Sequence, residues 1–243
     1  MTSPDDEWFE TWFGEDYVAL YPHRNEAEAE RVVGLIATTL AGRNIKRALD
    51  LACGSGRHSR FLGARWWTSG VDLSEVLLRM AQRDHTPASL VRADIRALPY
   101  RTDAFDLVVN LFTSFGYFET DDEHQLVILD IARVILSGGT FVLDYLNASE
   151  VQEQLVPFDQ KIVKGRSVEQ RREITTDGRF VLKRIAIPAE RREFVERVRL
   201  FHRSELVAML ERAGFSIEAS LGDYAGGPLT DSSPRVILFA RRS

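Results

Sequence analysis

The sequence of 243 residues has a single cysteine and no long hydrophobic run. One thiol, Cys53, excludes a disulfide within the chain and is typical of proteins from a reducing compartment. No apolar stretch approaches the roughly 20 residues that a transmembrane helix needs, so no membrane partner is expected. Acidic residues stand in positions 1–10, where a signal peptide would require an apolar core. We therefore expect a cytoplasmic protein.

The chain also lacks several patterns that would define its chemistry at once. No cysteine and histidine cluster has the spacing of metal ligands, and no nucleophile elbow of an acyl hydrolase is present. The net charge of −5 argues against a general nucleic-acid partner. Residues 160–203 nevertheless contain 13 basic against 6 acidic residues, a local net of +7. Arginine on exposed strand faces is the simpler interpretation, and contact with an anionic substrate or partner is the alternative.

The most informative segment that is present runs through residues 45–58. It reads as a buried strand, a glycine turn and the first turn of a helix that begins at Arg57. Gly54 and Gly56 permit a tight turn and a close approach of a ligand to the backbone. The helix start would direct unpaired N–H groups toward that ligand. This segment predicts a cofactor site.

Three acidic residues occupy the ends of successive predicted strands, and they narrow the choice of cofactor. Asp50 closes the first strand and can accept a hydrogen bond from an amine. Asp72 follows 22 residues later, where a carboxylate can accept both ribose hydroxyls. Asp94 closes the third strand, where it could accept from an adenine amino group with Ile95 packing on the ring. Each acid alone would be an ordinary surface carboxylate or helix cap.

A nicotinamide cofactor is the obvious competitor, because its enzymes use a similar glycine turn. The dinucleotide fingerprint requires glycine or alanine three residues after the second glycine, and this chain has Ser59 there. Asp50 inside the turn strand would also repel a pyrophosphate. A ligand with an amine and a ribose but no phosphate fits better, and S-adenosylmethionine has that chemistry.

The order of predicted elements indicates an α/β fold with a Rossmann-like, doubly wound and mostly parallel sheet. Residues 1–44 are expected to form helices that cover the cofactor site, and residues 45–155 with 204–243 form the core. Residues 156–203 contain three β-rich runs joined by turns, at 168–176, 179–187 and 193–201. We expect an antiparallel β insertion that leaves the carboxyl rim of the sheet and acts as a substrate lid. A stabilising or dimerising appendage is the alternative.

The sequence resembles class I S-adenosylmethionine-dependent methyltransferases. The matching parts are the glycine turn, the segment 71–74, Asp94 with its neighbours, the strand at 106–110 and the turn at 136–140. The resemblance covers most of the chain and implies a seven-stranded sheet whose last strand is antiparallel to the others. Ala52 stands where the family often has glycine, and Ser137 replaces a common proline. A closer likeness, to small-molecule methyltransferases, is carried by residues 17–24, 110–118 and the tail 222–235. It implies an N-terminal helix folded over the cofactor.

The residues expected to bind the cofactor come from the strand ends and from this N-terminal helix. Tyr17, Tyr21 or Arg24 could bind the methionine carboxylate by resemblance, with aromatic packing and a helix-end charge as the alternative. The full predicted set is Tyr17, Tyr21, Arg24, Asp50, Ala52, Gly54, Gly56, Asp72, Leu73, Asp94, Ile95 and Asn110.

The predicted activity is in-line methyl transfer from S-adenosylmethionine to an oxygen or nitrogen of an unidentified small molecule. Proximity and orientation can supply most of the acceleration, and an oxygen acceptor would also need a general base. Candidates for the catalytic group are His202, Tyr117 and Asp144, and a helix-end or packing role is the alternative for His202. Rival functions are a non-catalytic or regulatory cofactor-binding protein and an RNA methyltransferase that uses the basic insertion. A monomer or a homodimer is expected.

Overall fold

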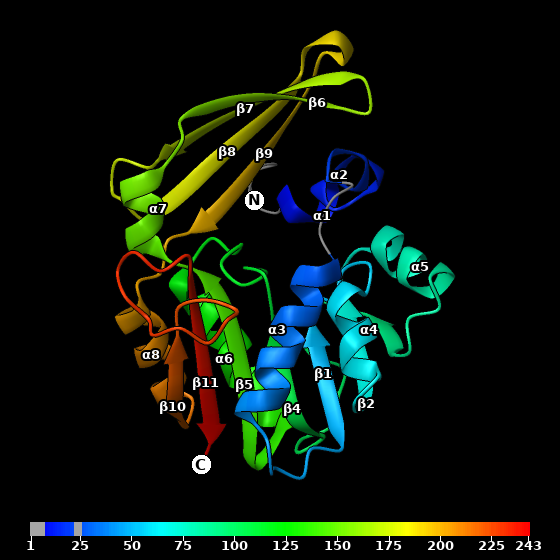
Figure 1. The fold of residues 1–243 in the computed structure, drawn as a ribbon, viewed down its shortest axis with the longest axis vertical. Helices are drawn as coiled ribbons and strands as arrows, with labels where there is room; N and C mark the ends of the chain where they lie inside the picture. Colours follow the sequence, from blue (N-terminus) through cyan, green and yellow to red (C-terminus); the bar gives the residue numbers. More distant parts are fainter. Residues whose placement is uncertain (1–7, 22–25) are drawn as a thin grey trace.

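The computed structural model describes residues 8–21 and 26–243. A central sheet of seven strands has the order β10-β11-β5-β4-β1-β2-β3 (Figure 1). Strand β11 is antiparallel to both of its neighbours, whereas the other adjacent pairs are parallel. The predicted seven-stranded, mostly parallel sheet is therefore confirmed. The strands are β1 (Arg47–Leu51), β2 (Trp67–Asp72), β3 (Ser89–Arg92), β4 (Phe105–Asn110), β5 (Ile135–Leu146), β10 (Phe215–Leu221) and β11 (Arg235–Arg242).

Helices cover both faces of this sheet, as the apolar character of its central strands requires. Leu107 and Val109 of β4 pack with the helices α3 (Glu26–Thr39) and α4 (Arg57–Gly63). Val108, which points to the other face, belongs to the core built with α6 (Asp121–Val134) and α8 (Arg203–Arg212). This alternation along one strand divides the apolar residues into two cores and explains the three-layer architecture.

Local capping fixes where several helices begin. The Ser74 side chain accepts a hydrogen bond of 3.2 Å from the Leu77 N–H, so α5 (Glu75–Arg83) starts where the sequence predicts. At α6, the Thr120 hydroxyl and the Glu123 carboxylate form a reciprocal capping box. Ser204, a residue type that favours N-cap positions, is the second residue of α8 and does not cap it. His202 is the N-cap, and its backbone N–H donates to Glu205 Oε2 at 2.8 Å.

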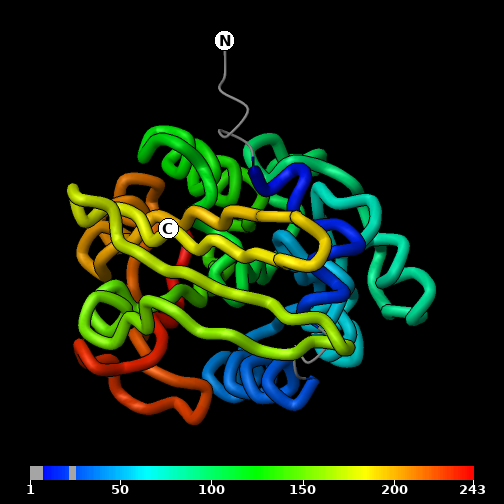
Figure 2. Tube along the Cα trace, turned by 90° about the horizontal axis from the view of Figure 1, so that it is seen from above, coloured from blue at the N-terminus to red at the C-terminus, as the bar shows by residue number. Residues whose placement is uncertain are grey.

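The insertion forms a second, antiparallel sheet of order β6-β7-β8-β9. It follows α7 (Ala148–Gln154) and comprises β6 (Phe158–Val163), β7 (Arg166–Ile174), β8 (Phe180–Ile187), the 3₁₀ turn η1 (Pro188–Glu190) and β9 (Arg192–Arg199). Three of its strands lie at the predicted runs, and β6 is an additional strand. Figures 1 and 2 show this sheet lying across the end of the molecule at which the parallel strands terminate.

Two short helices, α1 (Trp8–Trp12) and α2 (Glu15–Leu20), lie between the insertion and the rim of the central sheet (Figure 1). The rings of Trp12 and Phe194 are 4.5 Å apart, and the Trp12 indole donates to Glu196 Oε1 at 2.9 Å. Helix α3 packs instead on α4 and the sheet, with Val32 and Ile36 fully buried. Within residues 8–21 and 26–243, no helix combines the length and apolarity needed to span a bilayer.

Candidate cofactor and acceptor site

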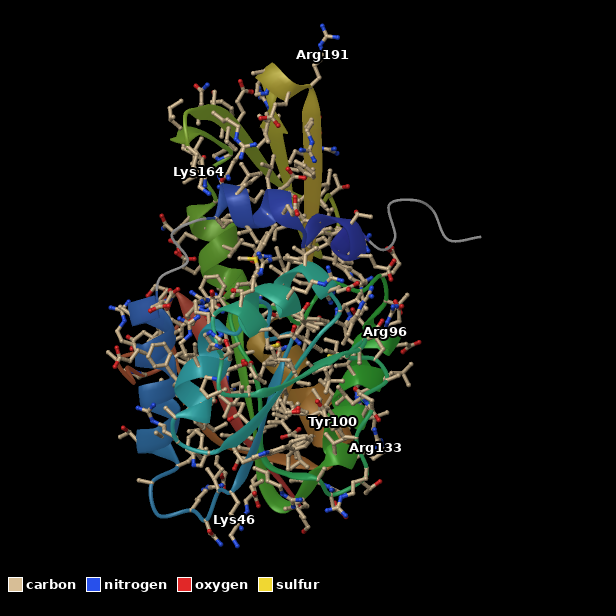
Figure 3. The ribbon with its side chains drawn as sticks, turned by 90° about the vertical axis from the view of Figure 1, so that its right-hand side faces the viewer. Lys46, Arg96, Tyr100, Arg133, Lys164 and Arg191 are labelled. Atoms are coloured by element: carbon tan, nitrogen blue, oxygen red, sulfur yellow. The ribbon has the colours of Figure 1, made fainter. Side chains whose placement is uncertain are left out.

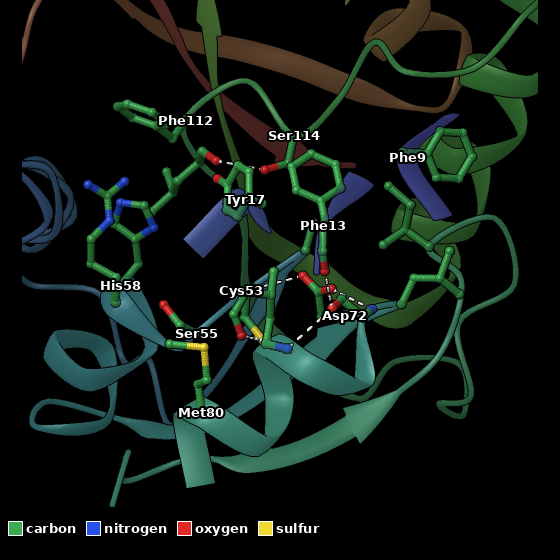
Figure 4. A pocket seen from close by; sticks show the side chains of 18 of the residues that line it. Phe9, Phe13, Tyr17, Cys53, Ser55, His58, Asp72, Met80, Phe112 and Ser114 are labelled. Atoms are coloured by element: carbon green, nitrogen blue, oxygen red, sulfur yellow. Dashed lines mark hydrogen bonds between the residues drawn. The ribbon is translucent and has the colours of Figure 1, made fainter. Parts of the chain in front are cut away.

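A cavity of about 310 Å³ lies between the glycine turn and the helices α1 and α2 (Figure 4). Its volume falls in the range of about 300–1,000 Å³ that is usual for small-molecule sites. It is located at the carboxyl ends of β1 and β2, where ligands bind in open α/β sheets. Nine predicted residues line it: Tyr17, Tyr21, Ala52, Gly54, Asp72, Leu73, Asp94, Ile95 and Tyr117.

The backbone of the glycine turn explains its composition. Gly54 has φ 55° and Gly56 has φ 78°, both in the left-handed region that glycine adopts most readily. A Cβ atom on Gly56 would also lie 2.7 Å from Thr86 Oγ1, so this position has no room for a side chain. Ala52 has φ 53°, which explains why glycine is common at this position in the resembling family and why alanine is strained here. Gly56 itself stays behind the turn and does not line the cavity.

Asp72 fixes the turn as well as lining the cavity. Its two carboxylate oxygens accept the N–H groups of Gly54 at 2.7 Å and of Ser74 at 2.8 Å. Burial raises the pKa of Asp72, and these hydrogen bonds act in the opposite direction. Each carboxylate oxygen has a second lone pair, so the group can also accept from a ligand hydroxyl.

Asp94 lines the cavity in an ion pair with the residue two positions later. Its Oδ2 lies 2.6 Å from Arg96 Nη2, and its Oδ1 accepts the Arg96 N–H at 2.8 Å. The Arg96 guanidinium in turn lies 5.0 Å from the centroid of the Phe118 ring, at the edge of the same cavity. The carboxylate is therefore oriented before any ligand arrives.

Asp50 and Asn110 lie beneath the cavity rather than on its surface. The Asp50 side chain is 1 % exposed and accepts a 2.6 Å hydrogen bond from the Ser59 hydroxyl. Burial raises the pKa of Asp50 to about 7. The Asn110 amide donates to the Leu51 carbonyl at 3.2 Å, while its buried Oδ1 has no hydrogen-bond partner among the described residues. Neither residue is among those that line the cavity.

Aromatic rings form the side of the cavity opposite the glycine turn (Figure 4). Tyr117 stacks on Phe13 at 5.6 Å between ring centroids, and Phe13 meets Tyr17 edge-on at 4.8 Å. The Ser74 hydroxyl donates to the Phe13 carbonyl at 2.5 Å and so connects the α1–α2 region to the rim. Arg24, the remaining predicted residue of this region, lies outside the described residues.

Of the three catalytic candidates, the structure places only Tyr117 in the cavity. Asp144 is fully buried and lies outside the cavity lining, in an ion pair with Arg235 at 2.7 Å. His202 is exposed and begins α8 outside the cavity lining. The expectations for Asp144 and His202 as general bases are therefore not supported by their positions.

Several cavity residues were not predicted, because nothing in their spacing sets them apart from core residues. Phe9, Phe13, Leu77, Met80 and Phe118 line the cavity and are ordinary apolar residues in the sequence. Phe112 and Thr113 are a different case. Both adopt left-handed backbone conformations, with φ 64° and φ 62°, although neither is glycine. The sequence carries no sign of this conformation.

Comparison with known proteins agrees with the fold. Residues 48–139 match the family described as a methyltransferase domain. The dTDP-3-amino-3,4,6-trideoxy-alpha-D-glucopyranose N,N-dimethyltransferase of Streptomyces venezuelae is 27% identical over 222 residues, covering 88% of this chain and 89% of that protein. The solved structure of the sugar N-methyltransferase KedS8 from a Streptoalloteichus species is 26% identical, covers 94% of this chain and 93% of its own, and has a TM-score of 0.71.

Three features together define a class I S-adenosylmethionine-dependent methyltransferase. They are a seven-stranded sheet with an antiparallel last strand, a glycine turn after β1, and acidic residues at the ends of the strands that follow. This chain is such an enzyme, with its methyltransferase domain over residues 48–139 and an antiparallel β insertion after β5.

Proposed function

We propose that the enzyme methylates the amino group of a small polar acceptor of the nucleotide-linked amino-sugar class. One observation carries this proposal. The cavity combines the aromatic faces of Phe13, Tyr17 and Tyr117 with carboxylates at its edges. Aromatic faces and carboxylates attract cations, and an aliphatic amine is cationic in water. The relatives named for sugar N-methylation support the same class of acceptor.

The residues of the cavity fit S-adenosylmethionine. Gly54 brings backbone close to the cavity, Asp72 has lone pairs for ribose hydroxyls, and Asp94 with Ile95 suits an adenine edge and face. When bound, the cofactor supplies an electrophilic methyl group on a positively charged sulfur. The remaining predicted contacts, including Asp50, Gly56 and Asn110, would act by supporting the turn from below.

The chain's own contribution is mainly to orient the acceptor and exclude water. An amine that binds as a cation must lose one proton before it attacks, and because water can accept that proton, no strong base is needed. Tyr117 is the candidate group beside the acceptor, where its hydroxyl could accept or pass on a proton. The insertion would act as a lid that closes the acceptor side, because its β9 strand contacts the α1–α2 region.

Paired acceptors test this proposal directly. The purified enzyme, S-adenosylmethionine and a panel of nucleotide-linked sugars would be incubated, each amino sugar being matched by the analogue with a hydroxyl at the same carbon. We expect S-adenosylhomocysteine and a product heavier by one methyl group only with the amines. His202→Ala is the control and should retain full turnover, because His202 lies outside the cavity lining. Methylation of the hydroxyl analogues alone, or cofactor binding without turnover on any amine, would refute the proposal.

A further inference from the structure

Phe112 and Thr113 form a strained turn at the wall of the cavity. Two consecutive residues with side chains have φ 64° and φ 62°, and the second is branched at Cβ. A β-branched residue is a true outlier in this region of backbone space. Such a conformation persists only where surrounding groups over-determine it. Phe112 lines the cavity, so the strain is located at the site rather than in a distant loop.

One buried residue holds both backbone N–H groups of this turn. The Phe112 N–H donates to Asp144 Oδ2 at 2.9 Å, and the Thr113 N–H donates to the Asp144 carbonyl at 3.0 Å. Asp144 lies near the carboxyl end of β5 and its side chain is fully buried. The turn is thereby tied to an inner strand of the sheet.

Two residues from the C-terminal tail complete the arrangement. Arg235 Nε donates to Asp144 Oδ1 at 2.7 Å, and the Tyr224 hydroxyl donates to Oδ2 at 2.8 Å. A second Arg235 nitrogen, Nη2, donates to the Thr113 hydroxyl at 2.9 Å. The network is closed, since Arg235 contacts both the carboxylate and the turn that the carboxylate holds. We call Asp144, Tyr224 and Arg235 the Asp144 clamp.

The loop that carries Tyr224 and Arg235 is itself fixed to the core. The Asn147 amide donates to the carbonyls of Thr230, Asp231 and Ser233 at 3.0, 3.0 and 2.8 Å. The Arg235 N–H donates to the Gly222 carbonyl at 3.0 Å. The clamp is therefore built into the fold and does not depend on a ligand.

The turn transmits this restraint to the cavity through Phe112. Two guanidinium groups lie over its ring, that of Arg57 at 4.7 Å from the centroid and that of Arg235 at 5.6 Å. Arg57 is the first residue of α4, directly after the glycine turn. The same segment continues into Ser114 and Tyr117, which also line the cavity (Figure 4).

We propose that Asp144, Tyr224 and Arg235 are positioning residues that hold Phe112 and Thr113 in the left-handed conformation and so preform the cavity wall at residues 111–118. None of the three lines the cavity. They act through the turn, and their effect is on cofactor binding more than on the stability of the fold. The inference rests on the methyltransferase assignment and is independent of the class of acceptor.

Conservative variants test the clamp. Tyr224→Phe removes one hydroxyl and keeps the ring, and Arg235→Lys keeps the charge but loses the two-pronged contact. Calorimetric titration with S-adenosylhomocysteine should give a Kd raised about tenfold for each variant, equivalent to about 1.4 kcal/mol. Thermal unfolding of the same samples should shift only slightly. Tyr224→Phe alone decides the matter if Arg235→Lys does not fold.

Matched controls remove a tyrosine hydroxyl and an arginine ion pair away from the cavity. The Tyr100 hydroxyl bonds to Ser69 at 2.7 Å, and Arg133 pairs with Asp130 at 2.6 Å. Both residues lie toward the end of the molecule opposite the insertion tips at Lys164 and Arg191 (Figure 3). Tyr100→Phe and Arg133→Lys should leave the Kd within about twofold of the unaltered enzyme, whatever they do to the melting temperature.

A rescue variant separates positioning from simple packing. Glycine adopts positive φ without strain, so Thr113→Gly should make the turn less dependent on the clamp. Adding Tyr224→Phe to a Thr113→Gly background should then raise the Kd by no more than about threefold, compared with about tenfold in the unaltered background. The proposal is overturned if clamp variants lower the melting temperature while the Kd is unchanged. It is equally overturned if Thr113→Gly leaves the tenfold loss intact.

Discussion

At the scale of single residues, Asp50 is a carboxyl group placed where a charge is costly. It is 1 % exposed, and burial raises its pKa to about 7, with repulsion from Asp72 acting in the same direction. The Ser59 hydroxyl and the Arg57 charge oppose this shift without cancelling it. The folded state therefore favours the protonated carboxyl, whereas the unfolded chain ionises near the ordinary pKa of 3.8.

Asp50→Asn is expected to change how stability depends on pH. A raised pKa means that the stability contribution of Asp50 is complete below pH 4 and is lost as the pH rises through about 7. Asparagine does not ionise, so its contribution to stability does not change with pH. The free energy of unfolding of the variant, relative to that of the unaltered enzyme, should therefore rise by roughly 2–4 kcal/mol in total between pH 4 and 8. Three pKa units correspond to about 4 kcal/mol. Urea unfolding of the cofactor-free protein at several pH values measures this difference.

A difference between the two proteins that stays constant from pH 4 to 8 would contradict the assignment of a protonated Asp50. Cofactor binding provides a second readout. A cationic ligand above the turn should favour ionised Asp50, so binding at pH 7 should release protons in the unaltered enzyme and fewer in Asp50→Asn. Calorimetry in buffers of different ionisation enthalpy detects this release.

The sequence predicted which strand ends meet at the cavity, but not how far below the rim each side chain lies. Asp72 is the last residue of β2 and lines the cavity. Asp50 is paired with Gly70, two residues before the end of β2, so it lies deeper in the sheet than Asp72 and beneath the cavity. Asp144 was placed correctly near the end of β5. Its partners, Tyr224 and Arg235, are 80 and 91 residues away in the sequence, so no local pattern could reveal its role.

At the scale of elements, one carboxylate of the insertion accepts hydrogen bonds from two residues of the α1–α2 region. Glu196 Oε1 on β9 accepts the Trp12 indole N–H at 2.9 Å and the Tyr21 hydroxyl at 3.2 Å. Glu196 Oε2 lies 3.5 Å from Lys183 Nζ on the neighbouring strand, and burial lowers the pKa of that lysine. Tyr21 lines the cavity, so Glu196 connects the insertion directly to the cofactor site.

Glu196→Ala should therefore release the cofactor product faster. Hydrogen bonds to a charged group contribute about 1.5–3 kcal/mol each, and part of this is recovered from water. We expect the dissociation rate constant of S-adenosylhomocysteine to rise about tenfold, as measured by stopped-flow fluorescence. Glu193→Ala is the control, because Glu193 lies three residues away on the opposite face of β9, where it pairs with Arg184 at 3.6 Å. Equal rates in both variants would show that Glu196 does not hold the helices.

Element boundaries were predicted well where capping or periodicity is strong, and missed where neither exists. In β6, two of the three apolar residues, Phe158 and Ile162, are exposed, so this edge strand has no regular apolar face. In α7, only Ala148 is buried, and the helix has no apolar stripe. The turn predicted at 136–140 lies inside β5, which begins at Ile135 and has a register shift against β4.

At the scale of the whole molecule, three separate parts of the chain meet at one cavity. The glycine turn belongs to the central sheet, α1 and α2 come from the N-terminal region, and residues 111–118 are held by the C-terminal tail. The insertion reaches the cavity through Glu196 and through Arg192, which pairs with Asp16 of α2. A ligand that fills the cavity should therefore stabilise segments that are distant in sequence.

Hydrogen–deuterium exchange can test whether these three parts and the insertion respond together. Saturating S-adenosylhomocysteine should slow amide exchange in residues 8–20, 52–57, 111–118 and 192–199, because local opening of each exposes the cavity. Strand β10, at the far edge of the central sheet, makes no contact with the cavity and should exchange as before. In Glu196→Ala, protection of 8–20 and 192–199 should fall while that of 52–57 remains. If protection in the unaltered enzyme is confined to 52–57 and 72–74, the N-terminal helices and the insertion do not close over the cofactor, and the lid role proposed for the insertion fails.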